Sequence, residues 1–118
     1  MYNKHTVGSQ YEQLAVEYLV KHGFEIVARN FRCGSGEIDI ISKEEEYLVF
    51  TEVKFRTNTL KGLPQEAVDV RKIRKITRTA EYYMLTCRIP ADTPCRFDVI
   101  VILGHDITLI RNAFEAIR

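Results

Sequence analysis

The apolar residues of this chain repeat with a helical period in two stretches and with a strand-like period elsewhere. Residues 11–19 carry apolar side chains at the spacing of one helix face. Gly8 and Ser9 can begin this helix, and Gly23 is expected to end it in the left-handed conformation. The predicted apolar face consists of Tyr11, Leu14, Ala15, Tyr18 and Leu19.

The remaining pattern predicts five strands and a second helix. The strands are expected at residues 24–29, 37–42, 47–55, 96–103 and 107–110, with a turn-rich segment at 30–36. The second helix is expected to run from Gln65 or Asp69 to Thr86, after a polar connection at 56–64 that is long enough to cover a site. Its predicted apolar face consists of Val70, Ile73, Ile76, Thr77, Ala80, Tyr83 and Met84. Residues 111–118 are predicted to form a short terminal helix.

This order of elements predicts an α/β fold built as one domain over residues 1–118. A strand, helix, strand passage makes the sheet mixed, because it brings parallel strands into a sheet that also contains a hairpin. We therefore expect a three-layer sandwich in which helices flank a central mixed sheet. A chain of 118 residues can bury roughly two-thirds of the surface that it exposes when unfolded.

Composition narrows the class of protein without identifying a function. No apolar run approaches the roughly 20 residues that cross a bilayer, and the first ten residues lack the apolar core of a signal peptide, so we expect a cytoplasmic protein. Three widely spaced cysteines argue against a disulfide framework or a structural zinc site. The net charge is +1, but residues 54–88 contain nine basic and three acidic side chains. Such asymmetry is typical of a surface that meets phosphate groups.

Candidate chemistry is concentrated in the two central predicted strands. Because strand side chains alternate between faces, Glu37 and Asp39 should share one side with Ile41, opposite the isoleucines that precede and follow Asp39. Glu52 and Lys54 should share one face of the next strand. A hairpin register can then place Asp39 beside Glu52 and Lys54. Two carboxylates and an ammonium group at a strand end suit a divalent cation and an attacking water; the alternative is an ion pair within the hairpin.

An acid followed by a hairpin and a Glu-x-Lys triplet resembles the PD-(D/E)xK nuclease superfamily. The wider pattern resembles its YraN family of endonuclease-like bacterial proteins, over nearly the whole chain. The resemblance rests on Gly8, Glu12, Ala15, Tyr18, Leu19, Gly23, Asn30, residues 36–41, Val49, Phe50, residues 52–54, Arg56, Pro64, residues 66–68, Lys72, Lys75, Ala80 and residues 96–99. One departure is Ile38, which precedes Asp39 where the namesake pattern has proline; that position varies among superfamily members.

The resemblance implies a restriction-endonuclease-like (tRNA-endonuclease-like) fold and a nucleic-acid substrate. It also implies that Asp39 and Glu52, joined by the Val53 carbonyl, are ligands of Mg²⁺, with Mn²⁺ as a substitute. Lys54 is then expected to orient the attacking water and to offset the negative charge that develops during phosphodiester hydrolysis.

Three further acidic residues are candidates for a role at the site or in the fold. Glu37 is a candidate for a second metal contact, and the alternative is a rim acid that pairs with Arg32. A glutamate on the first helix aids metal binding in some superfamily members, which makes Glu12 a catalytic candidate; the alternative is an acid on the solvated surface. Asp98 stands alone in an apolar strand, and we expect it to find a structural partner such as Arg96 or a helix amide.

Basic side chains near the second helix form the predicted nucleic-acid interface. They are Arg56, Arg71, Lys72, Lys75 and Arg78. Lys72 and Lys75 lie three residues apart, so they can contact neighbouring phosphates, and such contacts give affinity that is independent of sequence.

These patterns leave three hypotheses for function. The first is a Mg²⁺-dependent endonuclease that acts on structured DNA or on processing intermediates, with a homodimer considered because shape-selective relatives act as dimers. The second is a nucleic-acid-binding module that keeps the nuclease fold without cutting and works as a partner in a DNA repair or processing complex. The third is a structural protein with no nucleic-acid partner.

Overall fold

A computed structural model describes residues 4–56 and 69–118, with side chains from residue 9 onward. Its elements are α1 (Lys4–Lys21), β1 (Glu25–Cys33), β2 (Gly36–Glu44), β3 (Tyr47–Arg56), α2 (Val70–Thr86), β4 (Cys95–Leu103) and β5 (Asp106–Phe114). The predicted connection beyond Arg56, and Gln65 as a helix start, lie outside the described residues. Neither described helix is long and apolar enough to cross a membrane.

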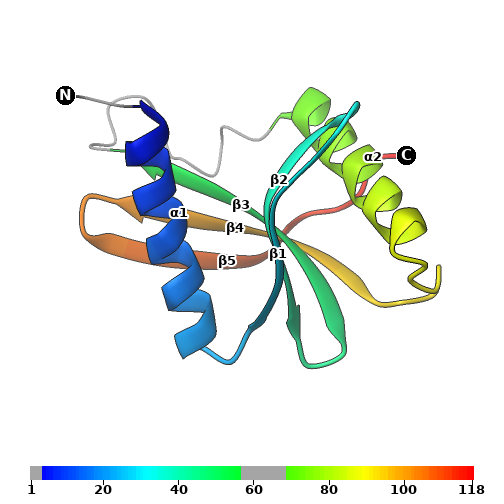
Figure 1. Ribbon diagram of the computed structural model, residues 1–118, viewed down its shortest axis with the longest axis horizontal. Helices are drawn as coiled ribbons and strands as arrows, with labels where there is room; N and C mark the ends of the chain where they lie inside the picture. Colours follow the sequence, from blue (N-terminus) through cyan, green and yellow to red (C-terminus); the bar gives the residue numbers. More distant parts are fainter. Residues whose placement is uncertain (1–3, 57–68) are drawn as a thin grey trace.

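A five-stranded sheet in the order β1-β2-β3-β4-β5 forms the centre of the fold (Figure 1). β3 and β4 run parallel, and the other neighbouring strands pair antiparallel. Val49 packs in the apolar cluster beneath α1, whereas Leu48 and Phe50 on either side of it pack beneath α2. The two helices therefore cover opposite faces, and the predicted mixed sheet flanked by helices is confirmed.

α1 is fixed to its face of the sheet by small and branched apolar side chains. Ala15 and Leu19 are fully buried there, and full burial of a side chain of leucine size contributes about 1.5–3 kcal/mol. Gly23 has a φ of +92°, which confirms the left-handed stop. Two details of the prediction are wrong: the helix already includes residues 4–8, and Leu14 is 43% exposed.

α2 begins with a side-chain cap. Asp69 accepts a hydrogen bond from the backbone N–H of Lys72 at 2.9 Å, so the helix starts at Val70. Its buried residues are Ile76, Thr77, Thr79, Ala80 and Tyr83. Val70 was predicted to lie on the apolar face, but it is 53% exposed because it lies at the first turn, beyond the sheet contact.

Two segments differ from the predicted secondary structure. β1 continues to Cys33, through the segment predicted as turns, because its pairing with β2 extends to Cys33 and Gly36. The predicted terminal helix is absent, and β5 runs on to Phe114 instead. The Phe114 ring stacks on that of Phe97 with 5.2 Å between centroids, so strand pairing and aromatic packing outweigh the local helical preference.

Candidate active site

The candidate site lies where β2 separates from β3. Backbone pairing between the two strands ends at Ile40 and Thr51, whereas β3 continues beside β4 as far as Arg56. Just beyond the last pair, Asp39 Oδ2 accepts a hydrogen bond from the Val53 N–H at 2.8 Å. The Asp39 carboxylate thus accepts a hydrogen bond from a β3 amide that lies beyond the backbone pairing with β2. Acidic side chains line the opening between the two strands.

The predicted alternation of faces is wrong at Asp39. Ile38 packs with Ile41 beneath α2, whereas Ile40 packs beneath α1. In the facing strand, Asn30 has a left-handed φ of 53°. Asn30 lies between the paired residues Arg29 and Phe31, so the break in the period of two falls opposite this left-handed residue.

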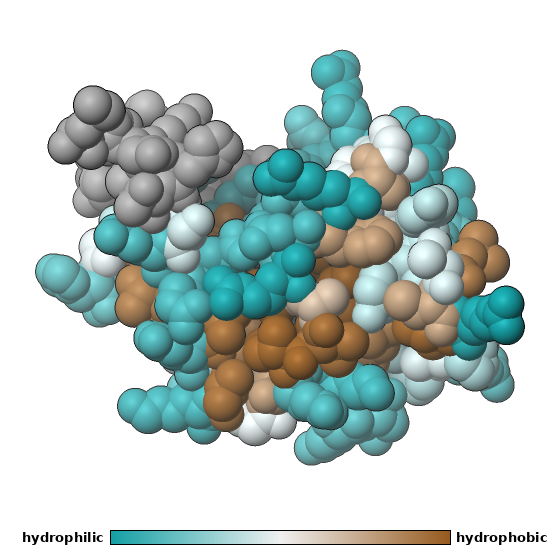
Figure 2. All heavy atoms as spheres, in the orientation of Figure 1, coloured by the Kyte–Doolittle hydropathy of each residue, from teal (hydrophilic) through white to brown (hydrophobic). Residues whose placement is uncertain are grey.

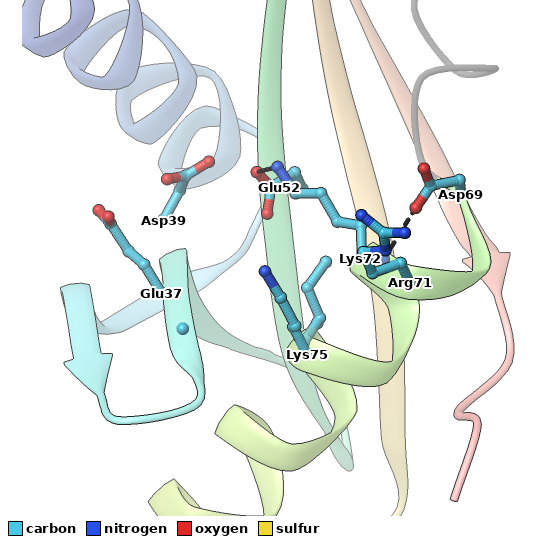
Figure 3. Close-up of a pocket in the computed structure, with 9 residues that line it drawn as sticks. Glu37, Asp39, Glu52, Asp69, Arg71, Lys72 and Lys75 are labelled. Carbon is cyan, nitrogen blue, oxygen red and sulfur yellow. Dashed lines mark hydrogen bonds and ion pairs between the residues drawn. The ribbon is translucent and has the colours of Figure 1, made fainter.

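A pocket of about 400 Å³ opens between the separated strands and α2 (Figure 3). It is lined by Gly36, Glu37, Asp39, Glu52, Asp69, Arg71, Lys72, Lys75 and Ile76. Glu37 and Asp39 come from β2 and Glu52 from β3, so acids on the sheet face bases on the helix. In Figure 3 the Lys75 ammonium group points into the space between them. The structure thus places Asp39 and Glu52 on one cavity, as the sequence predicted.

Two lysines converge on one oxygen of Glu52. Lys72 Nζ lies 3.0 Å from Glu52 Oε1, and Lys54 Nζ lies 3.8 Å from the same atom. Burial, and then the neighbouring Lys72, lower the pKa of Lys54. Burial also acts to lower the pKa of Lys72, but Glu52, Lys54 and Asp39 together outweigh it and the pKa is raised. The prediction assigned Lys72 to phosphate binding, whereas in the structure it contacts a candidate metal ligand.

The Asp39 carboxyl group is electrostatically crowded. Burial, and next the charge of Glu52, raise its pKa to about 7, with smaller contributions from Glu12 and Glu37. The Val53 N–H opposes this shift but does not cancel it. A carboxylate held this close to other acids is one whose charge a bound cation would relieve.

Glu12 and Glu37 lie at the edges of this group rather than at its centre. Glu12 Oε1 accepts a hydrogen bond from Asn30 Nδ2 at 2.6 Å, and Arg29 Nε lies 3.8 Å away. Glu37 lines the pocket, yet its carboxylate also pairs with Arg32 Nε at 3.2 Å. Both acids have structural partners and both raise the pKa of the central aspartate, so Glu37 fits both of its interpretations. The Glu12 side chain is only 14% exposed, so it is not the solvated surface acid that was its alternative.

The predicted phosphate-binding residues fall into two groups. Arg71 and Lys75 are exposed and line the pocket, and Arg78 is exposed one turn further along α2. Arg56 lies at the end of β3, where its guanidinium donates to the Phe55 carbonyl at 2.7 Å. The helix therefore presents a basic surface beside the cavity.

Sequence reasoning missed two contributions to the pocket. Asp69, interpreted only as a helix start, lines the cavity. Gly36 places the tip of the β1–β2 hairpin against α2, where an added Cβ would come within 3.3 Å of Thr79 Oγ1. The Asp-x-x-Lys spacing at the helix start was the available signal, because an N-cap aspartate sets its partner one turn into the helix.

The donor chemistry of the pocket fits a hard divalent cation. The described residues contain no group of three or more His, Cys, Asp or Glu side chains arranged to hold a metal. Two carboxylates and one backbone carbonyl nevertheless suffice for Mg²⁺, which keeps several of its waters. The N–H and C=O of one strand residue point towards the same neighbouring strand. Since the Val53 N–H donates to Asp39 on β2, the Val53 carbonyl also points towards β2.

Known proteins similar to this chain cover almost all of its length. The model of "Uncharacterised protein family UPF0102" matches residues 11–102. A UPF0102 protein of Lachnoclostridium phytofermentans is 54% identical, over 97% of each chain. UPF0102 proteins of Clostridium acetobutylicum and Caldicellulosiruptor saccharolyticus are 47% and 43% identical, over 92% and 95% of this chain and 93% and 99% of theirs. The chain therefore belongs to the family UPF0102, which is the YraN family that its motifs resemble.

Proposed function

We propose that this protein is a metal-dependent endonuclease of the PD-(D/E)xK type, with a restriction-endonuclease-like fold and DNA as its substrate. The observation that carries the proposal is the meeting of Asp39, Glu52 and Lys54 where β2 and β3 separate. Asp39 caps the Val53 amide, and Lys54 Nζ lies 3.8 Å from Glu52 Oε1. Asp39 and Glu52 line one open cavity, and Lys54 lies beside Glu52.

Each of these residues has a definable role in phosphodiester hydrolysis. Asp39 and Glu52, with the Val53 carbonyl, would hold Mg²⁺ or Mn²⁺. The bound cation would supply an activated water and neutralise charge on the phosphate. Lys54, which lies beside Glu52, would orient that water and offset charge that develops on the phosphoryl oxygens. Glu37 and Glu12 sustain the negative potential that attracts the cation.

The basic side of the pocket supports a polyanionic substrate. Between Arg71 and Arg78, α2 carries five basic residues and no acid. Lys75 and Arg71 border the cavity itself, so a strand whose phosphate enters the pocket has its neighbouring phosphates beside this helix. Figure 2 shows hydrophilic side chains over the upper part of this view and apolar ones lower down, between the helices.

The test is cleavage of branched, nicked and single-stranded DNA in Mg²⁺ or Mn²⁺. Glu52→Ala and Lys54→Ala should each lower the rate by about 100-fold or more, since each removes a group that acts on the transition state. Glu17→Ala, an exposed change on α1, is the matched control and should cleave at the wild-type rate. Activity that survives both pocket substitutions would show that the assigned residues are wrong. Matching RNA substrates and sedimentation of the active species test the choice of DNA and the homodimer.

A second candidate function is a nucleic-acid-binding module that does not cut. The observation that favours it is the neutralisation of Glu52 by two lysines, which gives the cluster charge balance from protein groups alone. Calorimetry separates the two: no uptake of Mg²⁺ or Mn²⁺, together with salt-sensitive DNA binding, selects the binding module. Such a module would act as a partner within a DNA repair or processing complex.

A further inference from the structure

Glu52 has more cationic partners than the proposed chemistry requires. Lys54 comes from the same strand face and suffices to orient a water. Lys72 reaches across from α2 and makes the shorter contact, 3.0 Å against 3.8 Å to the same Oε1 atom. The dashed line in Figure 3 shows this pair spanning the cavity from helix to sheet. The contact between Lys72 and Glu52 is therefore not accounted for by hydrolysis alone.

The two lysines differ in how firmly they are held. The Lys54 side chain is 15% exposed, whereas that of Lys72 is 39% exposed and lines the open pocket. A lysine stem has four rotatable carbons, so an ammonium group with an open side can leave its partner without moving the backbone. Lys72 can move while α2 stays in place, because the helix is held by its Asp69 cap and its buried face.

The position of Lys72 conflicts with a cation on Glu52. Glu52 Oε1 accepts a hydrogen bond from the Lys72 ammonium group at 3.0 Å. The lone pair that accepts this bond is one that a divalent ion would use on the same oxygen. A divalent ion on Oε1 would be a third cationic centre at an oxygen that already faces two ammonium groups, and it would repel both of them. A divalent ion that binds Glu52 through Oε1 would therefore displace Lys72 from that oxygen.

We propose that Lys72 is a tethered counter-ion: it occupies the place of the divalent cation on Glu52 and transfers to a substrate phosphate when that cation binds. The proposal rests on the function proposed above and adds a mode of regulation to the same site. It makes Lys72 a positioning residue that couples metal uptake to DNA binding. In the absence of metal the carboxylate stays neutralised, and in its presence a cation becomes available to the substrate.

The phosphate is the partner that the surroundings provide. Arg71 and Lys75 border the cavity on either side of Lys72 along the helix, so an anion lying there gains from all three. Of the other acids that line the same pocket, Asp69 accepts from the Lys72 backbone N–H and Glu37 pairs with Arg32. Asp39 accepts from the Val53 N–H and, in the proposed function, is a ligand of the same cation. A released Lys72 ammonium group thus finds its strongest new partner in an incoming phosphate.

Calorimetric titration with Mn²⁺ tests the displacement without requiring cleavage. Lys72→Met, which keeps the stem and removes the charge, should bind Mn²⁺ about tenfold more tightly than the wild type, because no hydrogen bond to a charged group has to be broken. Lys75→Met is the matched control: it removes the same charge from the same pocket one turn away, and its affinity should change less than twofold. Thermal unfolding followed by circular dichroism verifies that both variants fold.

The outcomes separate this inference from the proposed function. Equal Mn²⁺ affinity in the wild type and Lys72→Met, or an equal gain in both methionine variants, overturns the counter-ion role and leaves the metal site standing. No heat of Mn²⁺ binding in any of the three proteins overturns both proposals.

Binding of fluorescein-labelled DNA in Ca²⁺ and in EDTA tests the transfer to phosphate. Calcium is used as a hard cation that prefers oxygen ligands. If Ca²⁺ frees Lys72 to bind a DNA phosphate, cation binding and DNA binding strengthen each other through this side chain. The gain in DNA affinity on adding Ca²⁺ should therefore be several-fold larger in the wild type than in Lys72→Met. Equal gains in the two proteins would overturn the transfer.

Discussion

Two clusters of charge in this protein contain the same number of acids and bases but behave in opposite ways. The structural cluster consists of Glu44, Asp98, Arg96 and Arg111. The pocket cluster consists of Asp39, Glu52, Lys54 and Lys72. In the structural cluster, Arg96 donates to both acids at 2.7–2.8 Å and Arg111 donates to Glu44 at 2.8 and 3.0 Å. In the pocket cluster the two lysines share one carboxylate, and among the described residues Asp39 accepts a hydrogen bond only from the backbone N–H of Val53.

The difference lies in the geometry of the donors. An arginine fork can satisfy two carboxylate oxygens at once, whereas a lysine is a single mobile charge. Hydrogen bonds from Arg111 and Arg96 hold the pKa of Glu44 at about 2, even though burial acts in the other direction. Burial and the neighbouring Glu52 raise the pKa of Asp39 to about 7. Equal numbers of charges thus give a well-paired cluster at one end of β2 and an electrostatically crowded one at the other, and crowding of this kind is common at functional sites.

The largest expected effect comes from removing the centre of the structural cluster. Arg96→Met leaves Asp98, which is fully buried, without its two guanidinium donors and should lower the free energy of unfolding by about 3–5 kcal/mol. Arg111→Met, at a side chain that is 50% exposed, should cost about 1 kcal/mol or less. Urea denaturation measures both. Similar losses in the two variants would show that burial does not determine how much these ion pairs contribute to the free energy of unfolding.

The loss of stability at acidic pH should depend on the structural cluster. The folded-state pKa of Glu44 is depressed to about 2, so its contribution is present above about pH 4.5 and disappears as the pH falls through about 2. Glu44→Gln should therefore lose about 2–3 kcal/mol at pH 7 and almost nothing near pH 2. Urea denaturation at the two pH values gives the difference. A constant loss across this range would contradict the assignment.

The pocket cluster should show the opposite sign. The folded-state pKa of Asp39 is raised, so the folded protein retains a proton that the unfolded chain releases, and stability falls as the pH rises from about 4 to about 7. In EDTA at pH 8, Asp39→Asn should be more stable than the wild type by about 1–2 kcal/mol, after allowance for water in the open pocket. At pH 4 the two proteins should unfold at nearly the same urea concentration. A variant less stable than the wild type at pH 8 would exclude crowding of the carboxyl group.

The smallest effect on stability is expected on the exposed face of α2. Arg78→Ala should leave the unfolding free energy within about 0.5 kcal/mol of the wild type. The slope of DNA affinity against salt concentration should fall by about one ion, because one phosphate contact is lost. Lys43→Ala, at an exposed position near the far end of β2, is the control and should leave the slope unchanged. Equal slopes for all three proteins would place the DNA elsewhere.

Local patterns in the sequence were sufficient to predict the framework. In the part of the chain that the structure describes, the period of the apolar residues located both helices and all five strands, and local chemistry located the Gly23 stop and the Asp69 cap. These features depend on interactions within a few residues, which is why one sequence reveals them. Asp98 also behaves as expected: a buried acid in an apolar strand has to find a donor, and Arg96 two residues away supplies it.

Tertiary structure alone decided which charges meet and with what effect. The sequence placed Asp39, Glu52 and Lys54 near one another, but it could not show that Lys72 crosses the cavity to Glu52 or that Asp39 is crowded. Those facts depend on where α2 lies against the separated strands, a contact between segments about twenty residues apart that no local period encodes. The bend at Asn30 and the extension of β5 have the same origin, because pairing and packing with distant strands outweigh local preference.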